Sequence, residues 1–511
     1  MEEEEEIRSL ASFLRWAGEL GISDVVITDQ PQHSLSCLGY SLRVSHFPHS
    51  GGRGLSAVRD LRRGELILRV PKSALMTSEN VMDDKKLSIA VNNHPYLSSA
   101  QILTVCLLYE TGKGKSSKWH PYLMHLPRAY DILATFGEFE KQALQVDEAR
   151  WVAEKAILKA KSEWKEANAL MEEIKLKSQL LTFNAWLWAT ATISSRTLHV
   201  SWDEAGCLCP VGDLFNYDAP GREPSDPEDK EILVSNSSFH VSPDSNVDNT
   251  VVMLDAEELD SHFQRLTDGG FEEDLNSYCF YARENYKQGE QVLLCYGLYT
   301  NLELLEHYGF LLQENPNDKI FIPLESAVYS SSSWPKESLY VGHDGKPSFA
   351  LLSALRLWAT PKNKRKSVGH LVYSGSQLSV DNEIVVMKWL SKTCDSALKS
   401  LPTLTDEDAI LLNAMDNIQD FCGFMEITKM LSSRDEICAF LEANNVQDGH
   451  GLTDMLVSRK ARRSMAKWKL AVLWRLKYKK ALGNCISYCN EILESLQTYN
   501  AEMKKIERSV A

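Results

Sequence analysis

Four short segments of the sequence place polar and aromatic side chains beside glycine turns, where a site for chemistry could form. They are Gly52-Arg53-Gly54-Leu55 with Gly64-Glu65 shortly after it, Asp213 to Tyr217, Gly289 to Gly297, and Asn301 to Phe310. The usual signatures of phosphate binding (G-x-x-x-x-G-K-[ST]), zinc hydrolysis (H-E-x-x-H), serine nucleophiles (G-x-S-x-G) and dinucleotide binding do not occur. Each segment alone is typical of a β-turn or a buried polar anchor, but their order and spacing favour one composite site.

Taken together, the four segments resemble the SET-domain methyltransferases. Two stretches carry most of the resemblance: "GGRGLSAVRDLRRGELILRVPKSALMT", which begins at Gly51, and "GEQVLLCYGLYTNLELLEHYGF", which begins at Gly289. The more similar class has a helical insertion inside the SET domain and a helical C-terminal substrate-binding domain. Rubisco large-subunit lysine methyltransferase and the actin-histidine methyltransferase belong to it. The motifs cover residues 40–312, and domain order alone supports the resemblance for the remainder.

The resemblance implies an α+β fold that contains a pseudoknot. In a SET domain the C-terminal segment threads beneath an earlier loop, an arrangement that is rare in proteins generally. We therefore expect Asn216 and the segment around Tyr296 to lie together, although eighty residues separate them. The cofactor S-adenosyl-L-methionine (SAM) would lie in a surface pocket on one side, and the substrate side chain would enter a channel from the other.

Residue types in these motifs suit methyl transfer. The reaction is an in-line displacement at a cationic sulfonium, so catalysis depends mainly on holding the reacting atoms in line. Tyrosine hydroxyls and backbone carbonyls complement positive charge without competing as nucleophiles. The target amine must be neutral, although free lysine has a pKa of about 10.4. Burial in an aromatic channel and repulsion by the sulfonium both lower that pKa.

The resemblance also implies roles for individual residues. Tyr296 matches the catalytic tyrosine; without the resemblance it would be interpreted as a strand aromatic in the core. Arg196 matches an arginine that binds the SAM carboxylate through a charge-assisted pair, and a helix-terminal arginine capping carbonyls is the equal alternative. The other cofactor-binding residues that the resemblance implies are the strand Glu65, Leu66 and Ile67, whose backbone would border the adenosine, and Asp213, Asn216, Tyr217, Tyr296 itself and Tyr308.

Two positions depart from the family pattern. The family has histidine where this chain has Tyr217. If the position works through its backbone the exchange is tolerable, and if the imidazole is needed cofactor binding weakens. Leu198 stands where the histidine-specific relative has an asparagine that contacts its substrate, which argues against histidine as the target here.

The positions of these segments predict three parts: an N-terminal helical segment (1–39), a SET domain (40–312) and a helical C-terminal substrate-binding domain (313–511). The SET domain would hold a helical insertion at about 80–200, where apolar residues recur at helical spacing from Ala153 to Ile174. A second insertion, at about 218–250, is rich in Pro, Ser, Asn and Asp, and we expect it to be flexible.

Charge and composition restrict the partners. With 55 Lys and Arg against 70 Asp and Glu, the net charge is −15, so we expect a protein substrate rather than nucleic acid. The exception is Arg459 to Lys480, which has ten basic residues and no acidic one. We expect this segment to be a solvated face that folds against acidic residues of the same chain, and a surface for nucleic acid or an acidic partner is the alternative.

Cysteine usage and the terminal segments bear on the compartment. Eleven cysteines, an odd number without a second pair or a His cluster nearby, indicate reduced thiols and no metal site. The run Glu2 to Glu6 is unlike a signal or transit peptide, and the longest apolar stretch, Leu180 to Ile193, is too short to span a membrane. We expect an intracellular monomer, cytoplasmic or nuclear or both, that does not bind membranes.

Two functional hypotheses follow. The leading one is a SAM-dependent protein-lysine N-methyltransferase that acts on a non-histone protein, supported by Tyr296, Asn216 and Arg196. The alternative is a catalytically weak SET-fold scaffold whose helical domain binds a partner, which Tyr217 and the long insertion after it favour.

Overall fold

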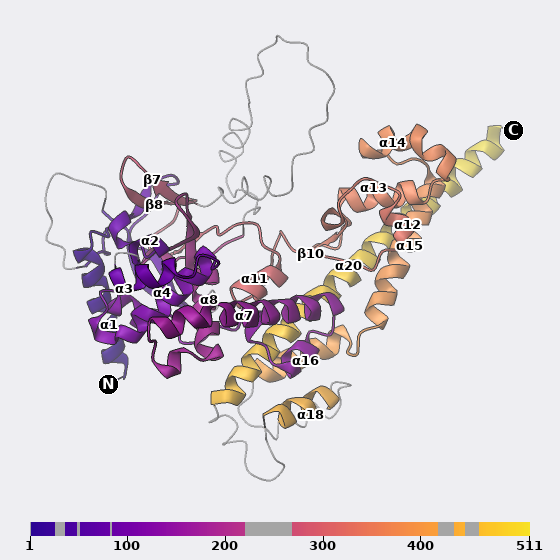
Figure 1. The fold of residues 1–511 in the computed structure, drawn as a ribbon. Coiled ribbons are helices and arrows are strands. Elements are labelled where there is room, and N and C mark those ends of the chain that lie inside the picture. The colour runs from indigo at the N-terminus through magenta and orange to yellow at the C-terminus, as the bar shows by residue number, and fades with distance from the viewer. Residues whose placement is uncertain are drawn as a thin grey trace. The chain divides into compact units, whose positions relative to one another are not determined.

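The computed structural model describes residues 2–25, 36–48, 52–81, 84–219, 268–416, 434–444 and 459–510 (Figure 1). It divides into two compact units, one of residues 1–130 and 160–298 and one of residues 131–159 and 299–511. The second unit thus begins before the expected boundary at 313, and it includes part of the helical insertion. Most of the polar insertion at 218–250 lies outside the described residues.

The first unit is built around a four-stranded sheet with the order β1-β2-β9-β6. Its strands are β1 (Leu42–Phe47), β2 (Gly52–Ala57), β9 (Gln291–Leu294) and β6 (Asn216–Tyr217). Neighbouring strands β1 and β2 are antiparallel, as are β2 and β9, whereas β6 runs parallel to β9. The short strand β6 therefore lies beside a strand that follows it by more than seventy residues, which is the threading that the SET resemblance implies.

Two further sets of strands complete this unit. The order β3-β8-β7 forms an antiparallel sheet, and β4 pairs with β5 in a hairpin. Phe280 and Tyr278 of β8 are buried in the core. The bounds are β3 (Leu66–Pro71), β4 (Thr197–Val200), β5 (Asp203–Leu208), β7 (Gly269–Glu272) and β8 (Ser277–Tyr281).

Helices α4 (Ser99–Lys113) and α8 (Phe183–Arg196) pack together in the first unit. A capping box of Ser98 and Gln101 begins α4, because each side chain satisfies a backbone amide that the first turn leaves without a partner. The described part of this unit also contains α1 (Glu2–Glu19), α2 (Ser78–Val81), α3 (Lys85–Asn92) and α5 (His120–His125).

The N-terminal segment is integrated into the first unit. Asp24 is buried, and its Oδ2 accepts hydrogen bonds of 2.8–3.0 Å from four successive backbone amides, those of residues 39–42. The ring of Phe13 stacks on that of His125 in α5, with ring centroids 4.9 Å apart. The described part of the N-terminal segment, residues 2–25 and 36–39, is therefore anchored to the first unit.

Within the described residues, the second unit is built mainly of helices, with the strand pair β10 (Lys319–Ile320) and β11 (Val341–Gly342). Its longest helix, α20 (Arg459–Val510), packs along α15 (Val380–Lys399) and against α16 (Thr405–Asp416) and α6 (Glu138–Ala143). The described part of this unit also contains α11 (Asn301–His307), α12 (Ser326–Tyr329), α13 (Phe349–Trp358), α14 (Arg365–Tyr373) and α18 (Arg434–Ala443). Together with the sheets of the first unit, these helices confirm the expected α+β fold.

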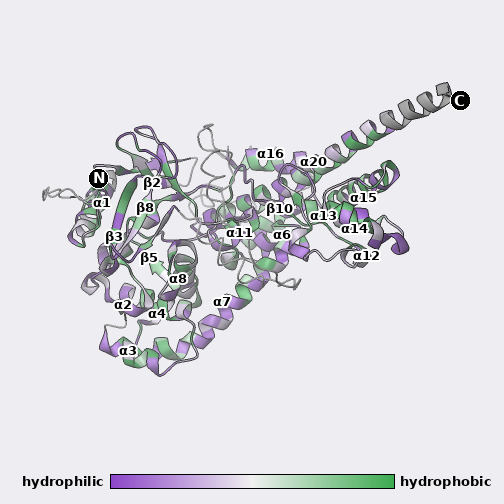
Figure 2. Cartoon of the chain, turned by 90° about the horizontal axis from the view of Figure 1, so that it is seen from above, coloured by the Kyte–Doolittle hydropathy of each residue, from purple (hydrophilic) through white to green (hydrophobic). Residues whose placement is uncertain are grey.

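One long helix, α7 (Asp147–Glu173), belongs to both units, with residues up to 159 in the second and those from 160 in the first. Hydrophobic and hydrophilic residues alternate along it, as its helical periodicity predicts (Figure 2). Ala153, Ala167 and Met171 are fully buried, whereas lysines and glutamates occupy its other faces.

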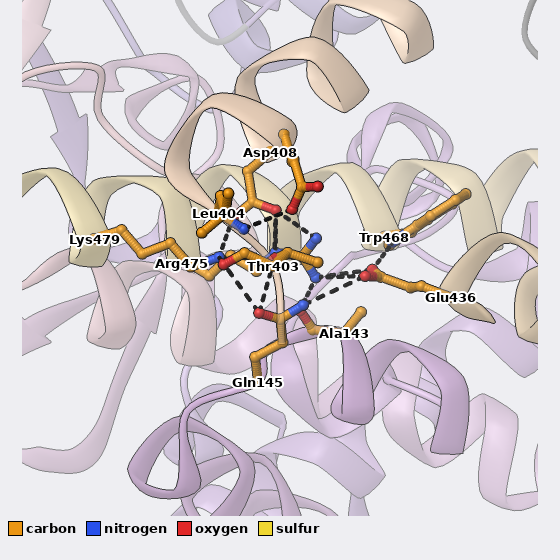
Figure 3. A network of polar contacts seen from close by, with 10 residues as sticks. Ala143, Gln145, Thr403, Leu404, Asp408, Glu436, Trp468, Arg475 and Lys479 are labelled. Carbon is orange, nitrogen blue, oxygen red and sulfur yellow. Dashed lines mark hydrogen bonds and ion pairs between the residues drawn. The ribbon is translucent and has the colours of Figure 1, made fainter. Parts of the chain in front are cut away.

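The basic segment 459–480 forms the first part of α20 and folds against acidic residues of the same unit. Arg475 donates to Asp408 Oδ1 (2.7 Å), to Glu436 Oε1 (2.8 Å) and to the carbonyl of Ala143 (2.7 Å) (Figure 3). Lys479 Nζ lies 2.6 Å from Asp408 Oδ2. The side chains of Arg475 and Asp408 are both 0% exposed. Arg475 and Lys479 thus fold against acidic residues of the chain as expected, but they are buried and do not lie on the solvated face that the sequence predicts.

This buried network keeps its charges. Burial lowers the pKa of Arg475, but attraction by Glu436 and Asp408 outweighs that effect and leaves the pKa above its ordinary value. For Lys479, burial prevails over Asp408 and the pKa falls below its ordinary value. Each ion thus depends on its partners, since an isolated charge in this core would be unsolvated.

We expect Arg475→Met to lower the free energy of unfolding by about 3–5 kcal/mol, because it removes the buried guanidinium that pairs with both Asp408 and Glu436 and leaves Lys479 as the buried partner of Asp408. Urea denaturation followed by circular dichroism measures the effect. The matched control is Lys469→Met on the same helix, whose pair with Asp416 is exposed and should contribute less than about 1 kcal/mol. Similar losses in both variants would contradict a structural role for the network.

Candidate active site

The centre of the candidate site is the crossing of two segments. Strand β6 pairs with β9 through Asn216 opposite Leu293 and Tyr217 opposite Leu294. Tyr296 follows β9, and its hydroxyl donates a hydrogen bond to the carbonyl of Phe215, the residue before β6. The structure therefore brings Tyr296 and Asn216 into one region, as the sequence predicts.

Tyr217, which replaces the family's histidine, reinforces this crossing. Its side chain is buried, and its hydroxyl donates to the carbonyl of Gly297 at 2.8 Å. Its ring lies 5.1 Å from that of Tyr296, centroid to centroid. Since the two tyrosines each bind the backbone of the other segment, Tyr217 fixes the chain directly after Tyr296.

Arg196 and Asp213 form an ion pair in the same unit. Arg196 is the last residue of α8, and Asp213 lies in the short 3₁₀ helix Gly212–Leu214. Nη1 of Arg196 donates to both the carboxylate Oδ2 and the backbone carbonyl of Asp213, each at 3.0 Å. Tyr122 of α5 donates to the same Oδ2 at 2.8 Å. The carbonyl that Arg196 contacts therefore belongs to Asp213, an acidic residue of the predicted site, and not to the end of α8 as the capping alternative has it.

The electrostatics of this pair keep a positive charge in place. Burial lowers the pKa of Arg196, yet Asp213 more than compensates and the pKa lies above its ordinary value. The Arg196 side chain is still 20% exposed, against 3% for Asp213. Its Nε is buried without a hydrogen-bond partner in the described part of the chain. Arg196 can therefore still donate to an anionic group, such as a ligand carboxylate.

The turn that carries Asp213 is conformationally constrained. Val211 is fully buried and has φ = 69°, a left-handed conformation that is unusual for a β-branched residue. A Cβ added to Gly212 would lie 2.5 Å from the Phe280 ring, so this position accepts only glycine without displacement. Such strain is often concentrated at functional sites.

Gly54 of β2 lies against Asn216, a contact that we did not predict. A Cβ at Gly54 would lie 2.5 Å from Asn216 Nδ2 and 3.1 Å from Gln291 Nε2. Its neighbour Arg53 donates to the carbonyl of His125 at 2.6 Å, and burial together with the nearby Arg196 lowers the pKa of Arg53. The glycine motif at 52–55 signals this role, because a side chain there would occupy the space beside Asn216.

The structure does not place all the predicted cofactor residues at the crossing. Glu65 forms an ion pair with Arg59, and its carbonyl accepts from the Ala282 amide at 2.8 Å. Leu66 and Ile67 belong to β3, in the sheet with β8 and β7, and a register shift between Leu66 and Leu68 places Ile67 at a bulge. Leu66 and Ile67 therefore lie in a different sheet from Asn216, and Glu65 directly precedes that strand.

Tyr308 belongs to the second unit. It caps the C-terminus of α11, and its ring lies 5.4 Å from that of Tyr299 and 6.0 Å from that of Phe310.

The described residues contain no metal site or membrane-spanning helix. Among them, no three His, Cys, Asp or Glu side chains are grouped as metal ligands would be. The described helices also include none that is both long and apolar enough to cross a membrane.

Tyr296 itself is a neutral hydrogen-bonding group at ordinary pH. Burial raises the pKa of its phenol well above the usual range, and the nearby Arg196 only partly offsets this. Its hydrogen is donated to Phe215, so toward a ligand the phenolic oxygen acts as an acceptor. A fixed cation, a neutral phenol and backbone carbonyls can together orient a charged ligand and an amine.

Comparisons with known proteins agree with this description. A family model described as Rubisco LSMT substrate-binding matches residues 313–431. Protein SET DOMAIN GROUP 40 of Arabidopsis thaliana is 56% identical over 496 residues, which are 96% of this chain and 97% of that protein. The actin-histidine N-methyltransferase of Danio rerio is 24% identical over 408 residues, 75% of this chain and 61% of that protein. The SET domain of LSMT, in a crystal structure with MeLysine and AdoHcy, has a TM-score of 0.54 and 18% identity, covering 96% of this chain and 93% of that chain.

The pseudoknot, the tyrosines at its crossing and the helical second unit define a SET-domain protein of the LSMT architecture. At 56% identity over almost its full length to SET DOMAIN GROUP 40, the chain belongs to the SET-domain methyltransferase family. The resemblance inferred from the two glycine-containing stretches is confirmed.

We expect Gly54→Ala to weaken SAM binding by about tenfold or more, or ~1.4 kcal/mol, because the new methyl group displaces the Asn216 side chain. Titration calorimetry measures the affinity, and the melting temperature without ligand should change little. Gly270→Ala in β7 is the control, since a Cβ there meets nothing within 4 Å. Unchanged affinity in Gly54→Ala would contradict a role for the contact between β2 and β6 in binding.

Proposed function

We propose that the protein is a SAM-dependent protein-lysine N-methyltransferase that acts on a non-histone protein. The observation that carries the proposal is the Tyr296 hydroxyl, bonded to the Phe215 carbonyl at the β6–β9 crossing with Arg196 nearby. This arrangement supplies an oxygen acceptor for an amine and a cation for a ligand carboxylate in one unit.

The residues present fit the cofactor. SAM, when bound, supplies the methyl group. Arg196 would hold its carboxylate, because Nε lacks a partner in the described part of the chain and Asp213 already fixes the orientation of the guanidinium. The approach of Gly54 to Asn216 leaves no room for a side chain and lets the β2 backbone border the ligand.

Tyr296 would orient the amine that receives the methyl group. Its phenol stays protonated because burial raises its pKa, so it does not compete as a nucleophile. The target lysine must lose its proton before transfer. The positive charge of Arg196 lies close enough to act on Tyr296, and it would also disfavour a protonated amine beside that hydroxyl.

Two observations support lysine rather than histidine as the target. Leu198, paired with Cys207 in the β4–β5 hairpin, offers no polar side-chain group at the position where the histidine-specific relative has asparagine. The matching LSMT structure contains MeLysine. The names of the similar enzymes refer to Rubisco and actin, which supports a non-histone substrate.

The scaffold alternative rests on Tyr217. Its hydroxyl binds the carbonyl of Gly297, next to Tyr296, so the exchange from histidine adds a contact within the crossing. The enzyme proposal is therefore compatible with the exchange of histidine for Tyr217. Turnover distinguishes the two functions, because an enzyme transfers methyl groups and a scaffold does not.

We expect Tyr296→Phe to lower turnover by about 10²-fold or more, the scale at which one preorganised electrostatic contact acts. SAM affinity should be retained, since the ring remains. The measurement is methyl incorporation from labelled SAM into proteins of a cell extract. Tyr109→Phe in α4, which removes a hydroxyl bonded to Asp84, is the control and should retain activity. Equal incorporation by Tyr296→Phe and wild type would refute the catalytic role, and none from either, with SAM bound, would favour the scaffold.

We expect Arg196→Ala to weaken SAM binding by roughly 1.5–3 kcal/mol through loss of a charge-assisted hydrogen bond. Calorimetry gives the affinity, and the melting temperature without SAM reports separately how much the unpaired Asp213 destabilises the fold. Arg59→Ala, which frees the Glu65 side chain, is the comparison and should bind SAM as the wild type does. If Arg59→Ala weakens binding while Arg196→Ala does not, Arg196 does not hold the SAM carboxylate.

A further inference from the structure

A basic and aromatic surface on the second unit takes no part in the site described above. Between residues 345 and 380 the sequence has six Lys and Arg and no Asp or Glu, although the chain as a whole carries a net charge of −15. This stretch contains α13 and α14, which pack on each other (Figure 1).

Part of this charge lies along one face of α14. Lys366, His370 and Tyr373 are spaced by four and three residues, so they share a face, and Lys362 lies four residues before them in the 3₁₀ turn Lys362–Lys364. All four side chains are exposed. We call these four residues, together with Trp334 and Phe349, the α14 stripe.

Aromatic rings extend the α14 stripe beyond the end of the helix. The ring centroid of Tyr373 lies 6.2 Å from that of Trp334, and the ring centroid of Trp334 lies 5.9 Å from that of Phe349. Phe349 is 47% exposed and Tyr373 is 42% exposed. Grouped aromatic rings that remain this accessible are characteristic of interaction surfaces.

The lysines of the α14 stripe differ from the neighbouring arginines in their pairing within the chain. Arg356 is buried and pairs with Glu383 at 2.7 Å, and Arg365 donates to the carbonyls of Trp358 and Thr360, so both serve the fold. Neither Lys362 nor Lys366 forms an ion pair with any residue that the structure describes. Their charges therefore remain available to a partner.

We propose that the α14 stripe docks an acidic segment of the protein partner, in which carboxylates flank an apolar side chain. Carboxylates would meet Lys362 and Lys366, and the apolar side chain would pack on the exposed rings of Tyr373 and Phe349. Charge complementarity gives the selectivity, since a basic partner would be repelled. The identification of this partner as a substrate rests on the proposed function, and the stripe lies within the residues matched by the substrate-binding family model.

The ring geometry favours a protein segment over nucleic acid. Trp334 and Phe349 meet edge to face, with an interplanar angle of 89°, and Tyr373 is tilted by 55° to Trp334. Successive bases would need roughly parallel ring faces on which to stack. An apolar side chain of a protein segment can pack on the exposed edges of these rings and on the face of one of them, so it does not need parallel rings.

The test is binding of a fluorescein-labelled peptide of about twelve residues that alternates Glu and Leu, measured by fluorescence anisotropy with the full chain and no SAM. Wild type should bind it, more weakly at high salt, because the contact is at the surface. Lys362→Glu/Lys366→Glu should weaken binding at least tenfold, and Tyr373→Ala about threefold or more. The control is Lys388→Glu/Lys392→Glu, which reverses two exposed lysines at the same spacing on α15 and should stay within twofold of wild type.

The inference is overturned if wild type fails to bind the peptide at millimolar concentration, if both double variants lose affinity equally, or if a single-stranded oligonucleotide binds more tightly than the peptide. Methyl incorporation into extract proteins is measured in parallel to keep the two proposals separate. One outcome supports the docking surface alone: the Lys362→Glu/Lys366→Glu variant loses peptide binding, and neither the wild type nor any variant methylates proteins of the extract. The enzyme proposal then fails. If wild type methylates the extract and all variants bind the peptide alike, the enzyme proposal stands and the docking surface is refuted.

Discussion

The parallel pairing of β6 with β9 is the constraint on which the candidate site depends. A two-residue strand has too few backbone hydrogen bonds to hold two distant segments in register by itself. Two tyrosine hydroxyls supplement it, that of Tyr296 on the Phe215 carbonyl and that of Tyr217 on the Gly297 carbonyl. Because each phenol is anchored on the opposite segment, the same contacts that close the pseudoknot also orient the residue proposed to act in methyl transfer.

The two units use buried ion pairs in different ways, and the two arginines concerned differ in how far their side chains are exposed. Arg475 is 0% exposed and is satisfied by Asp408, Glu436 and a carbonyl, so its charge serves packing (Figure 3). Arg196 has a similar acidic partner but remains 20% exposed, with an Nε that has no partner in the described part of the chain. An arginine that is oriented yet incompletely satisfied is suited to bind an anionic ligand.

Sequence motifs predicted which segments meet but not every residue that supports them. Tyr296, Asn216 and Arg196 lie in the expected unit, because the motifs that contain them also specify the threading. Tyr122 was missed, since it reaches Asp213 from a helix ninety-one residues earlier and no local pattern records that contact. The assignment of Glu65 to Ile67 to the cofactor comes from the resemblance and stays a prediction, because strand pairing alone does not show which backbone borders a ligand. Charge counting likewise identified the basic segment of α20 but could not distinguish the buried Arg475 from exposed neighbours.

A crystal structure of the full chain with S-adenosylhomocysteine tests the central claim most directly. The account predicts that the carboxylate of the ligand is hydrogen-bonded to Arg196 and that the ligand lies against Gly54 and Asn216, with the contact from Tyr296 to Phe215 intact. Any bound ligand that leaves Arg196 Nε without a partner, or that lies away from Gly54 and Asn216, would contradict it.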